Sequence, residues 1–218
     1  MPDLALEQDH GGLVCGIDEV GRGPLAGPVV AAAVVLDLDH MPRALRRGID
    51  DSKALSAEAR EDCALQLQHC AVIGLGAASV AEIDTINILR ASLKAMARAV
   101  RALGILPDAA LVDGNIPPPL PCPVRTVIGG DAKSLSIAAA SIIAKVTRDK
   151  MMRDLARRYP GYGWETNAGY ATRGHYEGLQ AFGATLHHRR SFAPVRLVLA
   201  GGSLQGELPL LDEAAPHE

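Results

Sequence analysis

The sequence predicts an α/β fold, with a mixed central β-sheet flanked by helices and a smaller C-terminal segment of helices and loops. Two short apolar runs, 13–18 and 28–36, follow each other directly, which favours an antiparallel hairpin. Strand and helix patterns alternate after them, which favours parallel pairing of the later strands. Residues 159–196 lack long apolar runs and contain every aromatic residue of the chain.

The elements are expected in a simple order along the chain. The runs 13–18 and 28–36 are the first two strands, and Ser56 caps a helix that reaches about Cys70. Residues 71–77 form a third strand, and apolar residues spaced by three and four predict a helix from Ile83 to Leu103. Two further strands follow at 109–113 and 124–128, before a long helix from about 133 to 158.

The chain is long enough for one core with short additions at both ends. It has 218 residues, of which 48% are hydrophobic, enough to bury a sizeable interior. We expect an N-terminal extension at 1–12, a core at 13–158, a C-terminal appendage at 159–199 and a mobile tail at 200–218.

Several features predict a soluble cytoplasmic protein. No apolar run is long enough to cross a bilayer, and Asp3, Glu7 and Asp9 stand where a secretory signal would be basic. The four cysteines form no Cys-x-x-Cys pair, so we expect them to be reduced, mostly buried and not part of a zinc site. We expect a monomer with no membrane partner.

The charge of the chain is unevenly distributed. Residues 1–124 carry 10 Lys and Arg against 16 Asp and Glu, residues 125–196 carry 12 against 5, and residues 197–218 carry none against 4. All aromatic residues lie in the basic window. Basic and aromatic side chains together suit a nucleic acid, because cations bind phosphates and rings stack on sugars or bases. The alternative is a solvated basic helix face beside a small aromatic core, and charge alone does not decide between them.

Four carboxylates lie at the ends of predicted elements. Asp18 and Glu19 end the first strand, Asp113 ends the fourth, and Asp131 begins the long helix. Ligands bind at strand ends in open α/β sheets, and carboxylates gathered there need a positive partner. Such oxygen ligands select Mg²⁺ or Mn²⁺, and two of these ions about 4 Å apart can promote attack of water on a phosphodiester. Taken singly, each carboxylate could instead be a cap, a turn former or a strand exit.

The pairing of Asp18 with Glu19 raises a geometric question. Adjacent strand residues point to opposite faces of a sheet, so both can bind one metal only if the strand twists or ends between them.

The glycine-rich stretch GRGPLAG at 21–27 follows these carboxylates directly. It matches neither common phosphate-loop pattern, and it leads to a strand where a phosphate loop would open a helix. We expect Gly21 and Gly23 instead to let backbone groups approach a ligand closely, because they have no side chain in the way.

These motifs together resemble bacterial ribonuclease HII, of the type 2 ribonuclease H family. The opening stretch GIDEVGRGPLAG at 16–27 is typical of that family, and the likeness covers about residues 13–196. Further matching stretches, in order, are 51–56, 83–89, 112–115, 130–131, 136–149, 169–170 and 187–192. The resemblance implies a ribonuclease H-like fold.

The resemblance also implies an activity. The protein would be a metal-dependent endonuclease, using Mg²⁺ or Mn²⁺, that hydrolyses the RNA strand of RNA–DNA hybrids. It would also cut on the 5′ side of single ribonucleotides in duplex DNA, leaving 3′-hydroxyl and 5′-phosphate ends, as in ribonucleotide excision repair. Asp18, Glu19, Asp113 and Asp131 would be the catalytic and metal-binding residues.

Substrate-binding residues are implied in the same way. The set is Gly21, Arg22, Gly23, Lys53, Tyr170, Arg189 and Arg190. The backbone of Gly21 to Gly23 would read the ribose 2′-hydroxyl, Tyr170 would stack on the neighbouring deoxyribose, and Lys53 would meet a phosphate. The two arginines would contact the substrate or, alternatively, hold the tail against the core through hydrogen bonds.

The chain departs from the family pattern at two places. Ala132 stands where many relatives have serine, and Asn167 and Ala168 precede Gly169 where a lysine is common. We expect altered backbone contacts there and intact chemistry.

Two other classes of protein remain as alternatives. A nucleotide-handling phosphotransferase of doubly wound type would need a phosphate loop that the sequence lacks. A non-catalytic nucleic-acid-binding module would have no use for four carboxylates beside a basic segment.

Overall fold

The computed structural model describes residues 1–49 and 55–204. The chain forms two compact units, the first from residues 1–20, 30–77 and 92–147, the second from 21–29, 78–91 and the residues from 148 onward. These units differ from the expected division at residue 158. Two early segments belong with the C-terminal residues, because Leu25 N–H donates to Gly169 O (2.8 Å) and Ser191 Oγ donates to Asp84 Oδ1 (2.6 Å).

A five-stranded mixed sheet forms the centre of the first unit, in the order β3-β2-β1-β4-β5. The strands are β1 (Val14–Val20), β2 (Val29–Leu36), β3 (Ala71–Ala78), β4 (Ala109–Asp113) and β5 (Val124–Val127). β1 pairs antiparallel with β2 and parallel with β4, and β4 pairs parallel with β5. The predicted hairpin, the parallel pairing and the α/β fold class are therefore confirmed.

The helices follow the strands as expected, with additions that the sequence patterns did not indicate. They are α1 (Ala5–His10), α2 (Arg43–Gly48), α3 (Ala57–Leu67), α4 (Val80–Ile86), α5 (Ile88–Ala102), the 3₁₀ turn η1 (Gly130–Ala132), α6 (Leu135–Arg158), α7 (Trp164–Asn167), α8 (Arg173–Phe182) and α9 (Ala193–Leu199). The short α1, α2 and η1 were not predicted, because each has too few residues to show a period.

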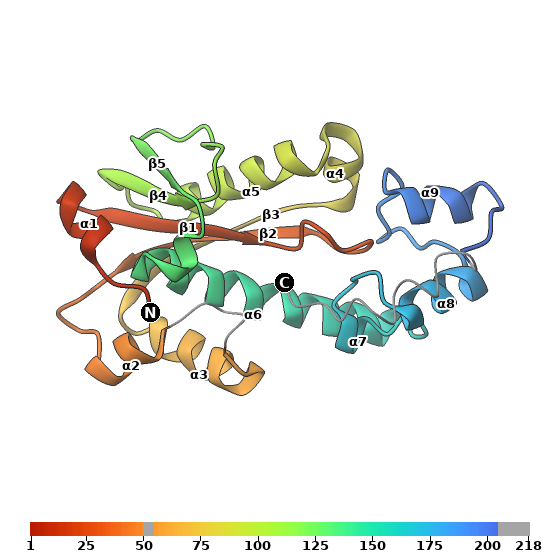
Figure 1. The fold of residues 1–218 in the computed structure, drawn as a ribbon, viewed down its shortest axis with the longest axis horizontal. Coiled ribbons are helices and arrows are strands. Elements are labelled where there is room, and N and C mark those ends of the chain that lie inside the picture. The colour runs from red at the N-terminus through yellow and green to blue at the C-terminus, as the bar shows by residue number, and fades with distance from the viewer. Residues whose placement is uncertain (50–54, 205–218) are drawn as a thin grey trace. The chain divides into compact units, whose positions relative to one another are not determined.

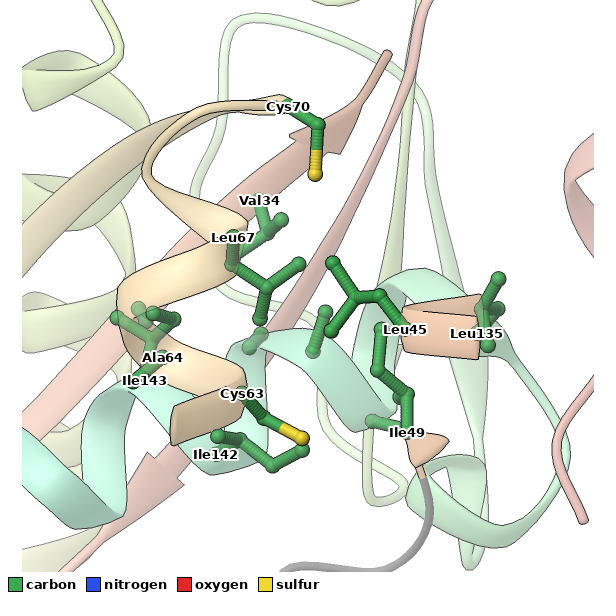
Figure 2. Close-up of a cluster of buried hydrophobic side chains, with 14 of the residues drawn as sticks. Val34, Leu45, Ile49, Cys63, Ala64, Leu67, Cys70, Leu135, Ile142 and Ile143 are labelled. Carbon is green, nitrogen blue, oxygen red and sulfur yellow. The ribbon is translucent and has the colours of Figure 1, made fainter. Parts of the chain in front are cut away.

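Helices cover both faces of the sheet in the first unit, with α5 on one face and α2, α3 and α6 on the other (Figure 1). Strand glycines allow this close packing. A Cβ atom at Gly76 of β3 would lie 2.1 Å from Ala95 O of α5, and one at Gly16 of β1 would lie 2.1 Å from the carbonyl carbon of Ser136 in α6. The main core lies between β2, α2, α3 and α6, where Leu45, Leu67 and Ile142 meet (Figure 2).

The helix expected from Ile83 to Leu103 is wrong as a single element. It is divided at Asn87, whose φ of 67° lies in the left-handed region and ends α4. The Asn87 side chain then accepts a hydrogen bond from Arg90 N–H (3.1 Å) and so caps the start of α5. The apolar spacing continues through the break, which is why periodicity alone missed it.

Three other expectations have outcomes in the structure. Ser56 caps α3 by accepting from Ala59 N–H (3.2 Å), as predicted. The cysteines are free, and three are buried while Cys122 is half-buried. Within the segment expected to be a mobile tail from residue 200, Leu204 is 1% exposed and packs with Leu179. Residues 205–218 lie outside the described residues.

Candidate active site and substrate loop

Asp18, near the end of β1, and Asp113, the last residue of β4, lie on neighbouring parallel strands and on the same face of the sheet. Ile17 of β1 lies opposite Val112 of β4, so the next residues, Asp18 and Asp113, emerge at one level and point the same way. That face packs against α6, because Leu111, two residues before Asp113, lies in one apolar cluster with Ile137. Strand register thus brings together two carboxylates that are 95 residues apart in the chain.

The electrostatics of this pair are those of a cation site. Asp18 is 7% exposed. Burial raises the pKa of Asp18 well above its ordinary value, and the charges of Glu19 and Asp113 raise it further. Hydrogen bonds from the Ser141 side chain and from Glu19 N–H (2.7 Å) lower the pKa of Asp18 but do not cancel these effects. A bound cation would remove this repulsion.

The charge of Glu19 also acts on Asp18, although β1 continues past both residues. β1 runs to Val20, so it does not end between the two adjacent carboxylates. Glu19 is half-buried, and its charge is the second largest cause of the raised pKa of Asp18.

Asp131 is brought to the end of β4 through its neighbour in the chain. Gly130 N–H donates to Asp113 Oδ1 (2.7 Å), so the η1 turn is fixed to Asp113. The Asp131 carboxylate accepts from Ala132 N–H (2.9 Å). Across residues 1–49 and 55–204, no three acidic, histidine or cysteine side chains stand together as a ready-made metal site.

The unpredicted α1 fixes the start of α6, just after Asp131. Glu7 Oε1 accepts from Ser134 Oγ (2.6 Å), Ser136 Oγ (2.7 Å) and Ser136 N–H (2.9 Å). A carboxylate at a helix N-terminus is favoured by the helix dipole. The N-terminal extension therefore has a structural role beside the η1 turn.

The loop at 21–27 is held from within the second unit by two buried arginines. Arg189 donates to Gly27 O (3.0 and 2.9 Å), to Arg22 O (2.8 Å) and to Gly21 O. Arg148 donates to Ala26 O (3.1 Å). Both guanidinium groups are fully buried, and all these bonds go to main-chain carbonyls.

The direct substrate contact predicted for Arg189 is therefore replaced by a structural role. A side chain with 0% exposure, whose donors are occupied by loop carbonyls, cannot reach a phosphate. The position of Arg189 fits the alternative role, in which it holds part of the chain through hydrogen bonds. Arg190 is exposed, and its backbone N–H donates to Asp84 Oδ2 (3.0 Å). Lys53 lies outside the described residues.

Gly23 and Tyr170 lie next to each other in the second unit. A Cβ atom at Gly23 would lie 3.6 Å from Cε1 of the Tyr170 ring, an ordinary van der Waals distance. Gly23 and Arg22 are exposed, whereas Gly21 is buried, and Tyr170 is half-buried. The structure thus places these predicted sugar-reading residues together.

Most of the other aromatic residues form a small core rather than a stacking surface. Tyr162 and Trp164 are 4% and 1% exposed, and their rings stack with centroids 5.0 Å apart. Tyr176 is also buried, in a second apolar cluster with Leu179. For these three residues the structure favours the small aromatic core over a surface that stacks on a nucleic acid. Tyr170 remains the ring beside the glycine loop.

Two buried histidines join this aromatic core. Trp164 Nε1 donates to His175 Nε2 (3.0 Å), and the Nε2 atoms of His175 and His188 are 3.1 Å apart. Burial lowers the pKa of His175. Burial, and then the charges of His175 and His187, lower the pKa of His188 to about 3. Neither residue was singled out from the sequence, where a histidine has no periodic signature.

We expect these histidines to make the protein sensitive to acid. An unfolded histidine has a pKa of about 6.5. The unfolded state therefore binds more protons than the native state below that pH, so this contribution to stability is complete above pH 6.5 and is lost as the pH falls toward 3. Thermal melting from pH 7.5 to 4.5 should show a falling melting temperature, with a shallower fall for His188→Asn. An equal slope in both proteins would contradict the assignment.

A cavity of about 510 Å³ lies elsewhere in the second unit. Its lining is mostly apolar, with Met151 and Leu155 of α6 and with Leu186, and none of the predicted site residues contributes to it. This cavity therefore does not mark the predicted site. Among the described residues, no helix has the length and apolarity needed to span a membrane.

Comparison with known proteins gives a consistent result. A family model described as Ribonuclease HII matches residues 15–195. The chain is 63% identical over 195 residues to Ribonuclease HII of Paramagnetospirillum magneticum, covering 89% of this chain and 97% of the relative. It is 59% identical over 208 residues to Ribonuclease HII of Rhodospirillum rubrum, covering 94% and 95%.

Solved structures agree with the fold. Ribonuclease H2 from Pyrococcus horikoshii has a TM-score of 0.70 at 28% identity, covering 84% of this chain and 95% of that one. The RNase HII of Archaeoglobus fulgidus, solved in a complex with PCNA, has a TM-score of 0.69 at 26% identity, covering 83% and 95%.

The mixed sheet, with carboxylates at the ends of adjacent strands, defines the class as an α/β nuclease of the ribonuclease H-like fold. Within that class, the chain belongs to the bacterial ribonuclease HII family. It is a ribonuclease H, an endonuclease and hydrolase, and the family acts on RNA–DNA hybrids.

Proposed function

We propose that this ribonuclease H uses Mg²⁺ or Mn²⁺ to hydrolyse the RNA strand of hybrids and to cut on the 5′ side of single ribonucleotides in duplex DNA. The products carry 3′-hydroxyl and 5′-phosphate ends, and the cellular role is ribonucleotide excision repair in the cytoplasm by a monomer. The observation that carries this proposal is the buried Asp18 beside Asp113, whose repulsion a cation would relieve, in a chain whose glycine-rich loop begins three residues after Asp18.

The four carboxylates fit a divalent metal by their chemistry. All are hard oxygen donors, and burial together with the charges of Glu19 and Asp113 raises the pKa of Asp18, so positive charge at this place would stabilise its ionised form. Asp18, Glu19, Asp113 and Asp131 would hold the metal. When bound, the metal supplies an activated water and stabilises the leaving oxygen of the phosphodiester. Gly130 N–H keeps Asp113 in place for this purpose by donating to its Oδ1 atom.

The loop reads the sugar through its main chain. The carbonyls of Gly21 and Arg22 face Arg189, and in a trans peptide the N–H lies opposite the C=O. The N–H groups of Arg22 and Gly23 therefore point away from the buried guanidinium. An outward N–H can donate to a ribose 2′-hydroxyl, which deoxyribose lacks. Recognition of this kind does not depend on the base.

Tyr170 completes the sugar site in this proposal. Its ring lies beside Gly23, where it can stack on the sugar that follows the ribonucleotide. Stacking of this type is worth roughly 1–3 kcal/mol by analogy with base–aromatic contacts.

A cleavage assay with end mapping tests the proposal. A DNA duplex with one ribonucleotide, labelled at the 5′ end of that strand, is incubated with Mg²⁺ or Mn²⁺ and with chelator as control. We expect one cut immediately 5′ of the ribonucleotide, with a 3′-hydroxyl on the labelled product. A cut on the 3′ side, or equal cleavage in chelator, would refute the proposed chemistry.

We expect binding of a hybrid to weaken steeply as salt rises. The basic surplus of residues 125–196 predicts phosphate contacts, and each contact contributes a slope of about −0.9 in log affinity against log salt for duplex DNA. The exposed Arg190 and the buried Arg189 offer a matched pair. Arg190→Ala should reduce the slope by about 1 with an unchanged melting temperature, whereas Arg189→Ala should lower the melting temperature. A flat salt response in the wild-type protein would show that the basic segment does not contact phosphates.

A further inference from the structure

A closed set of hydrogen bonds ends on the main chain of Tyr170. His175 Nδ1 lies 2.8 Å from Tyr170 O, and its other ring nitrogen faces both Trp164 Nε1 (3.0 Å) and His188 Nε2 (3.1 Å). Both histidines are 0% exposed and Trp164 is 1% exposed, so water does not compete for these contacts. The established activity does not account for this network.

The partners define the position of each ring proton. A carbonyl only accepts, so His175 carries its proton on Nδ1 and donates to Tyr170 O. The indole N–H only donates, which agrees with a lone pair on His175 Nε2. His188 Nδ1 accepts from Thr185 N–H (2.9 Å), so His188 has its proton on Nε2 and donates it to His175 Nε2. With one neutral tautomer of each ring, every contact pairs a donor with an acceptor, and the Trp164 and His188 N–H groups share the single lone pair of His175 Nε2.

The same bonds disfavour protonation of either ring. A second proton on His175 would face two donors, and one on His188 Nδ1 would face the Thr185 N–H and would have Thr185 Oγ1 (3.0 Å) as its acceptor. The other groups nearby are the Tyr162 ring, 6.2 Å from His175 and 4.9 Å from His188, and His187, whose charge acts on His188. Burial lowers the pKa of both rings as well, so the network favours neutral His175 and His188 near neutral pH.

The turn that carries Tyr170 is held on its other side as well. Tyr170 N–H donates to Asn167 O (2.8 Å), and the Asn167 side chain accepts from Gly169 N–H (2.8 Å). Thr172 caps α8 by accepting from His175 N–H (3.3 Å). His175 thus contacts the turn twice, once through its backbone and once through its ring. The orientation of the Tyr170 peptide depends on that ring.

We propose that His175 is the positioning residue for Tyr170, held in one tautomer by Trp164 and His188. Through Tyr170 it sets the preference for duplexes with a single ribonucleotide over continuous RNA–DNA hybrids. This rests on the proposed stacking role of Tyr170. A purely structural role would instead make His175 a satisfied core residue whose loss affects all substrates alike.

Two substitutions separate the two sides of the ring. His175→Asn retains a donor near the Nδ1 position and loses the acceptor toward Trp164, whereas His175→Gln retains an acceptor near the Nε2 position and loses the donor toward Tyr170 O. Each variant is measured for melting temperature and for kcat/KM on both substrates. Both are also made in a Tyr170→Ala background.

We expect His175→Gln to lower kcat/KM on the single-ribonucleotide duplex about tenfold more than on the hybrid, and His175→Asn to keep the wild-type ratio. In the Tyr170→Ala background, His175→Gln should leave the ratio unchanged. Equal losses of kcat/KM on both substrates would overturn the positioning role alone. So would a His175→Gln variant that changes the ratio as much in the Tyr170→Ala background as in the wild-type protein. If Tyr170→Ala itself leaves the ratio unchanged, the stacking role fails, and the positioning role with it.

A measurement on the wild-type protein covers the case in which the variants do not fold. Two-bond ¹H–¹⁵N NMR spectra near pH 7 should show a neutral His175 with its proton on Nδ1 and a neutral His188 with its proton on Nε2. A His175 proton on Nε2, or a charged ring, would overturn the proposal.

Discussion

Replacing Asp113 with asparagine should reduce cleavage by at least about a hundredfold, because a charged ligand to the metal is worth several kcal/mol and each 1.4 kcal/mol is a factor of ten. The fold should survive. Asparagine keeps the oxygen that accepts from Gly130 N–H, and its neutral side chain removes one of the charges that raise the pKa of Asp18. The melting temperature without metal should therefore be unchanged or slightly higher.

Metal binding by calorimetry, together with single-turnover cleavage, checks this expectation. Asp108→Asn provides a control, since Asp108 is a surface carboxylate that accepts from Leu13 N–H and takes no part in the site. Wild-type cleavage by Asp113→Asn at saturating Mg²⁺ would remove Asp113 from the metal site. A large fall in melting temperature would instead assign Asp113 a mainly structural role.

Replacing Gly23 with alanine should cause the second large effect, a loss of about tenfold or more in cleavage with no change in fold. Its Cβ would meet only Cε1 of Tyr170, at 3.6 Å, so the protein itself has room for it. The new methyl group would occupy the space beside the ring where we propose that the sugar lies. Cleavage assays and thermal melting measure the two consequences separately.

Gly21→Ala is the contrasting variant. Gly21 has a φ of +91°, and its added Cβ would lie 2.1 Å from Nε of the buried Arg148. Strained backbone of this kind costs about 1–3 kcal/mol before the collision is counted. This variant should therefore lose stability as well as activity. If Gly23→Ala lost stability to the same extent, or cleaved normally, the sugar site would not lie beside Tyr170.

The regular part of the fold could be predicted from sequence because it depends on local patterns. The strand at 109–113 was predicted with its observed bounds, and the Ser56 cap is confirmed, since both follow from short runs of residues. The break at Asn87 was missed, because a left-handed residue inside an apolar repeat leaves the spacing intact.

The candidate site was only partly predictable. Carboxylates at strand ends stand out in a sequence, and strand register then explains why Asp18 and Asp113 meet. The buried groups that hold the loop and the Tyr170 turn do not stand out. Arg148 and His175 donate to main-chain carbonyls. Every residue has such a carbonyl, so the residue types of the acceptors do not indicate these bonds. For the same reason the sequence left two roles open for Arg189, the substrate contact that the resemblance implies and the structural role that its bonds to loop carbonyls favour.

The chain passes between its two compact units five times, at residues 20–21, 29–30, 77–78, 91–92 and 147–148. A unit with a single junction can be gained, lost or exchanged between genes by one recombination event. Here a shortened protein that stops at residue 147 would keep 21–29 and 78–91 but lose the C-terminal residues with which those segments pack. We therefore expect the two units to have been inherited together, and expect chimaeras of related enzymes to fold only when all three segments of the second unit come from compatible parents.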